Sequence, residues 1–195
     1  AEASVLIFKT IADPFVGKLS YFKVISGVVK PDIKLKSIRT GDEERFSKIM
    51  WLKGGKQEDA KEIIAGDIGC AAKLSYALTG DVLSVSGKAE PIEIAFPMPS
   101  LSVAVYPKTK GEEEKAASGL ARLAEEDPTI LIKTDSETHE QILSGLGEQH
   151  IDVIVSRLKS KFGVDVELKK PKIAYRETIR KSVKAQGRHK KQSGG

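Results

Sequence analysis

Turn signals recur about every ten residues through the first half of the chain. They combine Gly with a small polar or acidic residue, as in Thr40-Gly41-Asp42 and Thr79-Gly80-Asp81. Between these turns, residues 19–29 and 33–38 alternate apolar with polar side chains. A period of two is typical of strands that bury one face. Many short strands with glycine at the corners predict a small β-barrel over residues 1–94.

The pattern changes at residues 95–100, where Pro97 and Pro99 stand two residues apart. Proline lacks a backbone N–H donor and fixes φ, so this stretch favours a stiff, extended chain. A length of 195 residues is sufficient for two small domains, each with its own core. We therefore interpret residues 95–100 as a linker between two domains.

Residues 101–170 alternate between strand and helix patterns. Strands are predicted over residues 101–106, 129–134, 140–144 and 164–168. The first helix is predicted to begin with a Thr-x-x-Glu capping box at Thr109 and Glu112 and to end at Asp127-Pro128. The second carries apolar residues at helical spacing, namely Ile151, Ile154, Val155, Leu158 and Phe162. The order βαββαβ predicts a ferredoxin-like domain, so the fold class is mixed β and α+β.

The C-terminal part of the chain is strongly basic. Residues 168–195 contain ten Lys or Arg and one acid, a net charge of +9, and the other 167 residues carry −4. Such a segment can contact RNA phosphates, or it can be a solvated tail. Residues 172–184 also have the pattern of another strand, and residues 171–195 are too short to fold alone. The candidate RNA contacts are Lys169, Lys170, Lys172, Arg176, Arg180, Lys181 and Arg188.

The residues that several enzymatic reactions and metal sites require are absent from this sequence. No glycine-rich G-x-x-x-x-G-K-[ST] phosphate loop occurs, and the chain contains no asparagine. The three histidines and the single cysteine, Cys70, lack metal-ligand spacing, and Cys70 lies in an apolar run that predicts a buried thiol. No apolar run approaches the ~20 residues of a membrane-spanning helix. We expect no catalytic, cofactor or metal site, no membrane contact and a cytoplasmic location.

Longer motifs occur in the order found in elongation factor G, and the chain resembles that family over nearly its whole length. In residues 1–94, the motifs that resemble the second domain are residues 11–19 (IADPFVGKL), 65–68 (AGDI) and 79–81 (TGD). In residues 101–170, those that resemble the third domain are residues 107–110 (PKTK), 125–129 (EEDPT) and 144–150 (SGLGEQH). Residues 171–195 are similar to the start of the fourth domain.

The resemblance implies a segment that binds the ribosome and couples it to a GTPase domain. The barrel would contact small-subunit ribosomal RNA, and the third domain would contact a small-subunit protein and the GTPase domain of the same parent. GTP and Mg²⁺ would bind that missing domain, so this chain would neither hydrolyse GTP nor move transfer RNA. The residues that would face the GTPase domain are Asp127, Thr129, Glu148, His150 and Arg157.

Two of these residues also have simpler interpretations. Glu148 stands in the first turn of a helix, where a negative charge is favourable, and it can act as a cap. His150 can be a half-buried histidine whose hydrogen bonds are satisfied by a neighbour. An RNA-recognition motif would carry stacking aromatics on its central strands, and here only Tyr106, at a strand end, could stack.

Some positions depart from the family pattern. Gln149 replaces the leucine usual after Gly-Glu, and residues 54–57 and 75–78 also differ. These departures leave open a paralogue that acts in ribosome recycling or rescue. A stand-alone RNA-binding adaptor is a second alternative, based on the basic segment. No set of residues in the sequence supports a hydrolytic enzyme.

Overall fold

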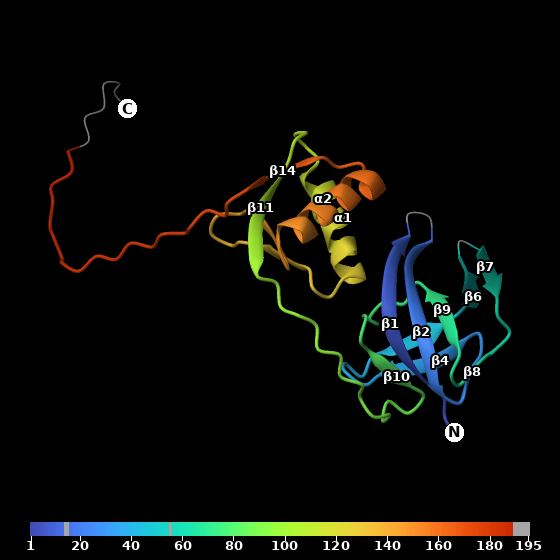
Figure 1. The fold of residues 1–195 in the computed structure, drawn as a ribbon. Coiled ribbons are helices and arrows are strands. Elements are labelled where there is room, and N and C mark those ends of the chain that lie inside the picture. The colour runs from blue at the N-terminus through green and yellow to red at the C-terminus, as the bar shows by residue number, and fades with distance from the viewer. Residues whose placement is uncertain (14–15, 55, 189–195) are drawn as a thin grey trace, which may run out of the picture.

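The first folded unit is a curled antiparallel sheet of eight strands, in the order β5-β4-β10-β1-β2-β9-β6-β7 (Figure 1). The computed structural model describes residues 1–13, 16–54 and 56–188. A separate two-stranded ribbon pairs β3 (Val28–Val29) with β8 (Ile63–Ile64). The strands of the large sheet are β1 (Ser4–Asp13), β2 (Gly17–Ser26), β4 (Ile33–Ser37), β5 (Glu43–Phe46), β6 (Ile49–Lys53), β7 (Lys56–Asp59), β9 (Ile68–Ala72) and β10 (Val82–Ser84).

The inner face of the curled sheet holds its own apolar core. Phe22 and Phe46 meet edge to face with ring centroids 5.4 Å apart, and Ile7, Leu35 and Leu83 are fully buried around them. Along β4 and β5, buried residues alternate with residues of greater exposure. This period is the one that the sequence predicted, because successive side chains of a strand point to opposite faces. The prediction of a translation-factor-type β-barrel fold for this region is confirmed.

The second unit is a four-stranded antiparallel sheet with two helices. Its strand order is β12-β13-β11-β14, the ferredoxin-like arrangement that the sequence predicted. Both helices lie on one face of this sheet, and Leu120, Leu143 and Leu158 are fully buried between the layers (Figure 1). The elements are β11 (Leu101–Pro107), α1 (Glu113–Glu126), β12 (Leu131–Thr134), β13 (Gln141–Gly145), α2 (Glu148–Phe162) and β14 (Val166–Lys169).

The predicted capping box at the start of α1 is wrong. Glu112 occupies the N-cap position, and no side chain caps the helix. Gly111 has a φ of +90°, which turns the chain so that the backbone N–H of Glu112 donates to the carbonyl oxygen of Thr109 at 3.3 Å. The N–H that the Thr109 hydroxyl would accept in a capping box therefore already has a partner.

The strand pattern of residues 172–184 forms no strand in this chain, in agreement with the expectation that residues 171–195 are too short to fold alone. No helix or strand occurs between β14 and residue 188, and Figure 1 shows this segment running away from both sheets. Its apolar residues Ile173, Tyr175 and Ile179 are each at least 72% exposed. A strand needs a neighbour for its backbone hydrogen bonds, and within the described residues no strand pairs with this segment. The end of the C-terminal segment, residues 189–195, lies outside the described residues.

Candidate functional site

Three of the residues predicted to face a GTPase domain form one hydrogen-bonded cluster. Asp127 Oδ1 accepts from the backbone N–H of Thr129 at 2.9 Å and from its hydroxyl at 2.5 Å. Asp127 Oδ2 lies 3.1 Å from Nε2 of His150, so the loop after α1 is tied to the first turn of α2. Burial alone would raise the pKa of the Asp127 carboxyl, but the hydrogen bonds from Thr129 and His150 outweigh it and lower that pKa.

His150 is held from both sides of its ring. The backbone N–H of Leu146 donates to Nδ1 at 3.0 Å, so this nitrogen carries no proton and Nε2 is the one that donates to Asp127. His150 is therefore a partly buried histidine whose two ring nitrogens both have hydrogen-bond partners, as its simpler interpretation predicted. Gly145 lies close beside it: a Cβ there would lie 2.9 Å from Cδ1 of Ile151 and 3.1 Å from Nδ1 of His150, so a larger residue would displace these side chains.

The other two residues of the predicted set do not join this cluster. Glu148 is exposed in the first turn of α2, where it makes no capping hydrogen bond. Among the described residues, no ion pair or hydrogen bond involves the Glu148 side chain. Arg157 is half exposed, and its Nη1 lies 3.8 Å from Glu126 Oε2 at the contact between α2 and the barrel. Both charged groups are therefore accessible to a partner.

The predicted RNA-contacting residues fall into two groups. Near β14, the Lys169 ammonium lies 3.2 Å from Glu167 and 5.2 Å from the centre of the Tyr106 ring, and Arg176 pairs with Glu137. The ammonium of Lys172 is 3.9 Å from Glu140. For the remaining four, the described residues provide no ion pair; these are Lys170, Arg180, Lys181 and Arg188.

Glu140 was missed by the sequence prediction of site residues. Its side chain is almost fully buried, and it accepts hydrogen bonds from the Tyr106 hydroxyl, from the Thr138 hydroxyl at 3.2 Å and from the backbone N–H of Lys172 at 2.8 Å. The hydrogen bond from Tyr106 lowers the pKa of the Glu140 carboxyl. This carboxylate therefore attaches the start of the C-terminal segment to the sheet, and Tyr106 is engaged with it.

Glu126 was also missed, although it lies between the two units. Its Oε1 accepts from the backbone N–H of Ala12 in β1 at 2.7 Å and from the Lys161 ammonium in α2 at 2.6 Å. Beside it, the ammonium of Lys18 in β2 lies 3.7 Å from Glu125. The signal in the sequence that could have found Glu126 is the pair of acids at the C-terminal end of α1, where the helix dipole disfavours negative charge.

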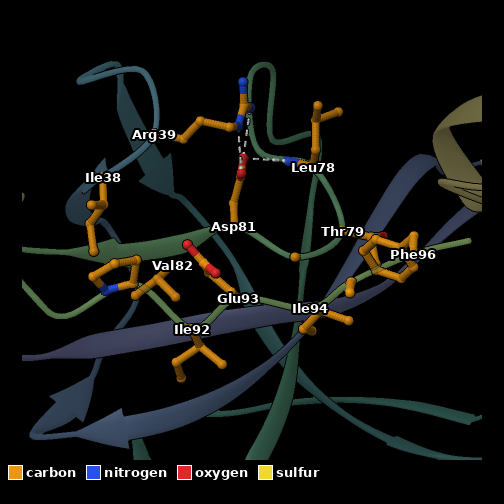
Figure 2. Close-up of a pocket in the computed structure, with 13 residues that line it drawn as sticks. Ile38, Arg39, Leu78, Thr79, Asp81, Val82, Ile92, Glu93, Ile94 and Phe96 are labelled. Carbon is orange, nitrogen blue, oxygen red and sulfur yellow. Dashed lines mark hydrogen bonds and ion pairs between the residues drawn. The ribbon is translucent and has the colours of Figure 1, made fainter.

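A hollow of about 740 Å³ lies between the barrel and the connecting residues 91–96. Figure 2 shows Arg39 and Asp81 joined on one side of it, with Ile92 and Ile94 on the other. The guanidinium of Arg39 donates to both carboxylate oxygens of Asp81, at 2.6 and 2.8 Å, and the backbone N–H of Leu78 donates to Oδ2. Asp81 of the Thr-Gly-Asp motif therefore organises a turn of the barrel.

The described side chains offer neither a metal site nor a reactive thiol. Within residues 1–13, 16–54 and 56–188, no group of three His, Cys, Asp or Glu side chains could hold a metal ion. Cys70 is buried, and burial raises the pKa of its thiol to about 12, which makes it unreactive. None of the helices in the described part of the chain combines the length and apolar character needed to cross a bilayer.

Comparison with known proteins gives two matches to models of one family. The model described as Elongation factor G domain 2 matches residues 2–86, and the model described as Elongation Factor G, domain III, matches residues 96–170. The two matches follow one another along the chain. Each one coincides with one of the two folded units.

A crystal structure of a protein from Thermus thermophilus has the same fold, with a TM-score of 0.77 and 32% sequence identity. The match covers 93% of this chain and 27% of that chain, so this chain spans 27% of the length of the relative. Taken with the two consecutive domain matches, this similarity shows that the chain belongs to the elongation factor G family, whose second and third domains it contains.

Proposed function

We propose that this chain is the ribosome-binding and coupling segment of a translation elongation factor that promotes movement of transfer RNA and messenger RNA. The observation that carries this proposal is the pair of consecutive matches to the second and third domains of elongation factor G. We also propose the domain limits 1–94, 101–170 and 171–195, with 95–100 as the linker. Two separate apolar cores support this division.

The proposed partners are small-subunit ribosomal RNA, a small-subunit protein and the GTPase domain of the same parent, all in the cytoplasm. The GTPase-facing residues would be Asp127, Thr129, Glu148, His150 and Arg157. The hydrogen bonds that fix Asp127 to Thr129 and His150 support a preformed surface, and the exposed charges of Glu148 and Arg157 leave it open to a partner. GTP and Mg²⁺ would bind the GTPase domain, so this chain itself would have no catalytic activity.

A competition experiment tests ribosome binding. Ribosomes are mixed with fluorescently labelled full-length elongation factor G and a non-hydrolysable GTP analogue, and the 195-residue chain is added at increasing concentration. We expect the chain to displace the labelled factor, because its two domains would occupy the same sites. Failure to displace the labelled factor at any concentration, together with no sedimentation of the chain with small subunits, would contradict the proposal.

A second candidate function is RNA binding without the ribosome, as an adaptor. The observation that favours it is the cluster of basic residues after β14, of which Lys170, Arg180, Lys181 and Arg188 have no ion pair among the described residues. This function predicts that naked RNA binds the chain with strong salt dependence. Replacement of these four residues by Gln would then abolish RNA binding, whereas the ribosome competition by the two folded domains would persist.

A third candidate is a paralogue whose parent acts in ribosome recycling or rescue, and the departures from the family pattern, such as Gln149, favour it. The parent of such a paralogue would promote subunit splitting or release of stalled ribosomes, and it would not support repeated translocation. Measurement of both activities with the parent protein distinguishes these roles.

A further inference from the structure

Two acids occupy the last turn of α1, where they do not help the helix. Glu125 and Glu126 end α1, and that turn contains no basic residue. The C-terminal end of a helix carries the negative end of its dipole, so an acid at this position disfavours the helix. The role of these two acids lies instead in the contact between α1 and the barrel, where both side chains have partners.

The side chain of Glu126 is 7% exposed, and it contacts two elements other than its own helix. From its own position on α1 it accepts the backbone N–H of Ala12 in β1 and the ammonium of Lys161 in α2. The guanidinium of Arg157, also in α2, lies 3.8 Å from its second oxygen. A single carboxylate thus joins one barrel strand to both helices of the α+β domain.

The partner in the barrel is a backbone amide on an open strand edge. Strand β2 pairs with β1 along its full length, but β10 pairs with β1 only from Ser4 to Leu6. The N–H of Ala12 points away from β2, because it donates to Glu126. Such an edge requires a hydrogen-bond acceptor when it is covered, since an unpaired buried N–H is costly. The Glu126 carboxylate provides that acceptor.

Beside the Glu126 contact, side chains do not fill the whole boundary between the two units. Two clefts of about 260 and 300 Å³ lie along this contact. The first is lined by residues that include Lys18, Arg122 and Glu125, and the second by residues that include Lys9, Arg157 and Lys161. The Lys18–Glu125 pair is partly exposed, and an exposed ion pair contributes little to stability. Two domains with a small polar interface move relative to one another unless a specific contact holds them.

We propose that Glu126 is the positioning residue that fixes the angle between the barrel and the α+β domain. It does so by accepting the open-edge amide of Ala12 and the ammonium of Lys161 at the same time. The barrel edge at Ala12 is therefore the docking surface for the end of α1. The contact lies within the chain itself, so its test does not depend on ribosome binding.

Distances between spin labels on the two units test the proposal. Cysteine is introduced at Lys23 in β2 and at Lys133 in β12, both exposed positions, and pulsed electron paramagnetic resonance measures the distance distribution. The native Cys70 stays unlabelled because it is buried, with its thiol pKa raised to about 12. The unmodified interface is expected to give one narrow distribution. We expect Glu126→Ala to widen it by about twofold or more, since the domains then lose their fixed contact.

The matched control is Glu114→Gln, which removes an exposed acid from the same helix away from the barrel. It is expected to leave the distribution unchanged. A Glu126→Ala chain that keeps the wild-type circular dichroism spectrum and a narrow distribution would overturn the proposal. If Glu126→Ala does not fold, Glu126→Met, which keeps the length of the side chain but has no oxygen to accept the Ala12 amide, is measured instead. It is expected to widen the distribution, and an unchanged width would also overturn the proposal.

Discussion

Buried carboxylates hold both folded units in shape, but their partners differ between the barrel and the α+β domain. In the barrel, Glu44 accepts the backbone N–H groups of residues 75–77, and Asp81 accepts from Arg39 and Leu78. All these partners belong to the barrel. In the α+β domain, Glu126 contacts the barrel strand β1, and Glu140 contacts the backbone of the C-terminal segment.

This difference indicates that the barrel stabilises itself, whereas the α+β domain also connects its neighbours. The two apolar cores are separate. The hydrogen bond from Ala12 to Glu126 and the ion pair of Lys18 with Glu125 join the two units. A domain of this kind suits the proposed coupling function, because a change of angle breaks a few hydrogen bonds and leaves both cores intact.

The largest effect is expected from Leu120→Ala in the core of the α+β domain. Leu120 is fully buried, and truncation of a buried leucine costs about 3 kcal/mol. The helical circular dichroism signal arises from α1 and α2, whereas the single tryptophan, Trp51, lies in β6 of the barrel. In urea, the helical transition should move to lower concentration while the Trp51 fluorescence transition stays in place. An equal shift of both would show one cooperative core.

A somewhat smaller loss is expected from Glu44→Ala in the barrel. Glu44 is 4% exposed, and its removal leaves three backbone donors without their acceptor, at a cost of about 2 kcal/mol. Here the Trp51 transition should move and the helical transition should not. The control is Glu58→Ala on exposed β7, which should change stability by less than about 0.5 kcal/mol. Movement of the helical transition in Glu44→Ala would show that this carboxylate acts beyond the barrel.

Asp127→Asn should remove a pH dependence from the α+β domain. The pKa of the Asp127 carboxyl is lowered in the folded chain, so its hydrogen bonds stabilise the fold above the ordinary Asp value of about 3.9. That stability is lost as the pH falls through the lower folded pKa. Replacement should cost about 1 kcal/mol at neutral pH and less in acid. Urea unfolding of the helical signal across this pH range measures it, and parallel curves for wild type and variant would contradict it.

The most local effect is expected from Glu140→Ala, which should release the C-terminal segment and also leaves the Tyr106 and Thr138 hydroxyls without this acceptor. The backbone N–H of Lys172 loses its acceptor, so its amide should exchange with solvent several-fold faster in an NMR hydrogen-exchange experiment. Glu177→Ala, in the exposed segment itself, is the matched control and should not change this rate. Unchanged exchange at Lys172 in Glu140→Ala would show that the segment is attached by other contacts.

The alternation and spacing of apolar residues predicted both folds, because strands and helices bury every second residue or one helical face. The helical stripe that contains Ile151, Ile154 and Leu158 is buried as expected. The prediction of a capping box was wrong because Gly111 has a positive φ and turns the chain just before α1. A short sequence motif does not by itself specify the backbone conformation.

The acids that join one unit to another segment could not be predicted in the same way. Glu126 binds a backbone amide 114 residues away in the sequence, and Glu140 binds one 32 residues away. A side chain that accepts from a backbone N–H requires no particular residue at the partner position, so no pairing pattern is visible in the sequence. For Asp127 and His150, the resemblance to the elongation factor G family implied a shared region, and the structure shows their direct contact.

Hydrogen exchange of the Ala12 amide, measured residue by residue in the 195-residue chain, tests most directly whether the α+β domain holds the barrel through Glu126. Among the described residues, no strand pairs with this edge of β1 at Ala12, and the amide donates to Glu126 instead. We expect slow exchange in the wild-type chain and fast exchange in Glu126→Ala, with the amides of Ser75 and Ala77 equally protected in both. Fast exchange of Ala12 in the wild-type chain, or slow exchange that survives Glu126→Ala, would contradict the account.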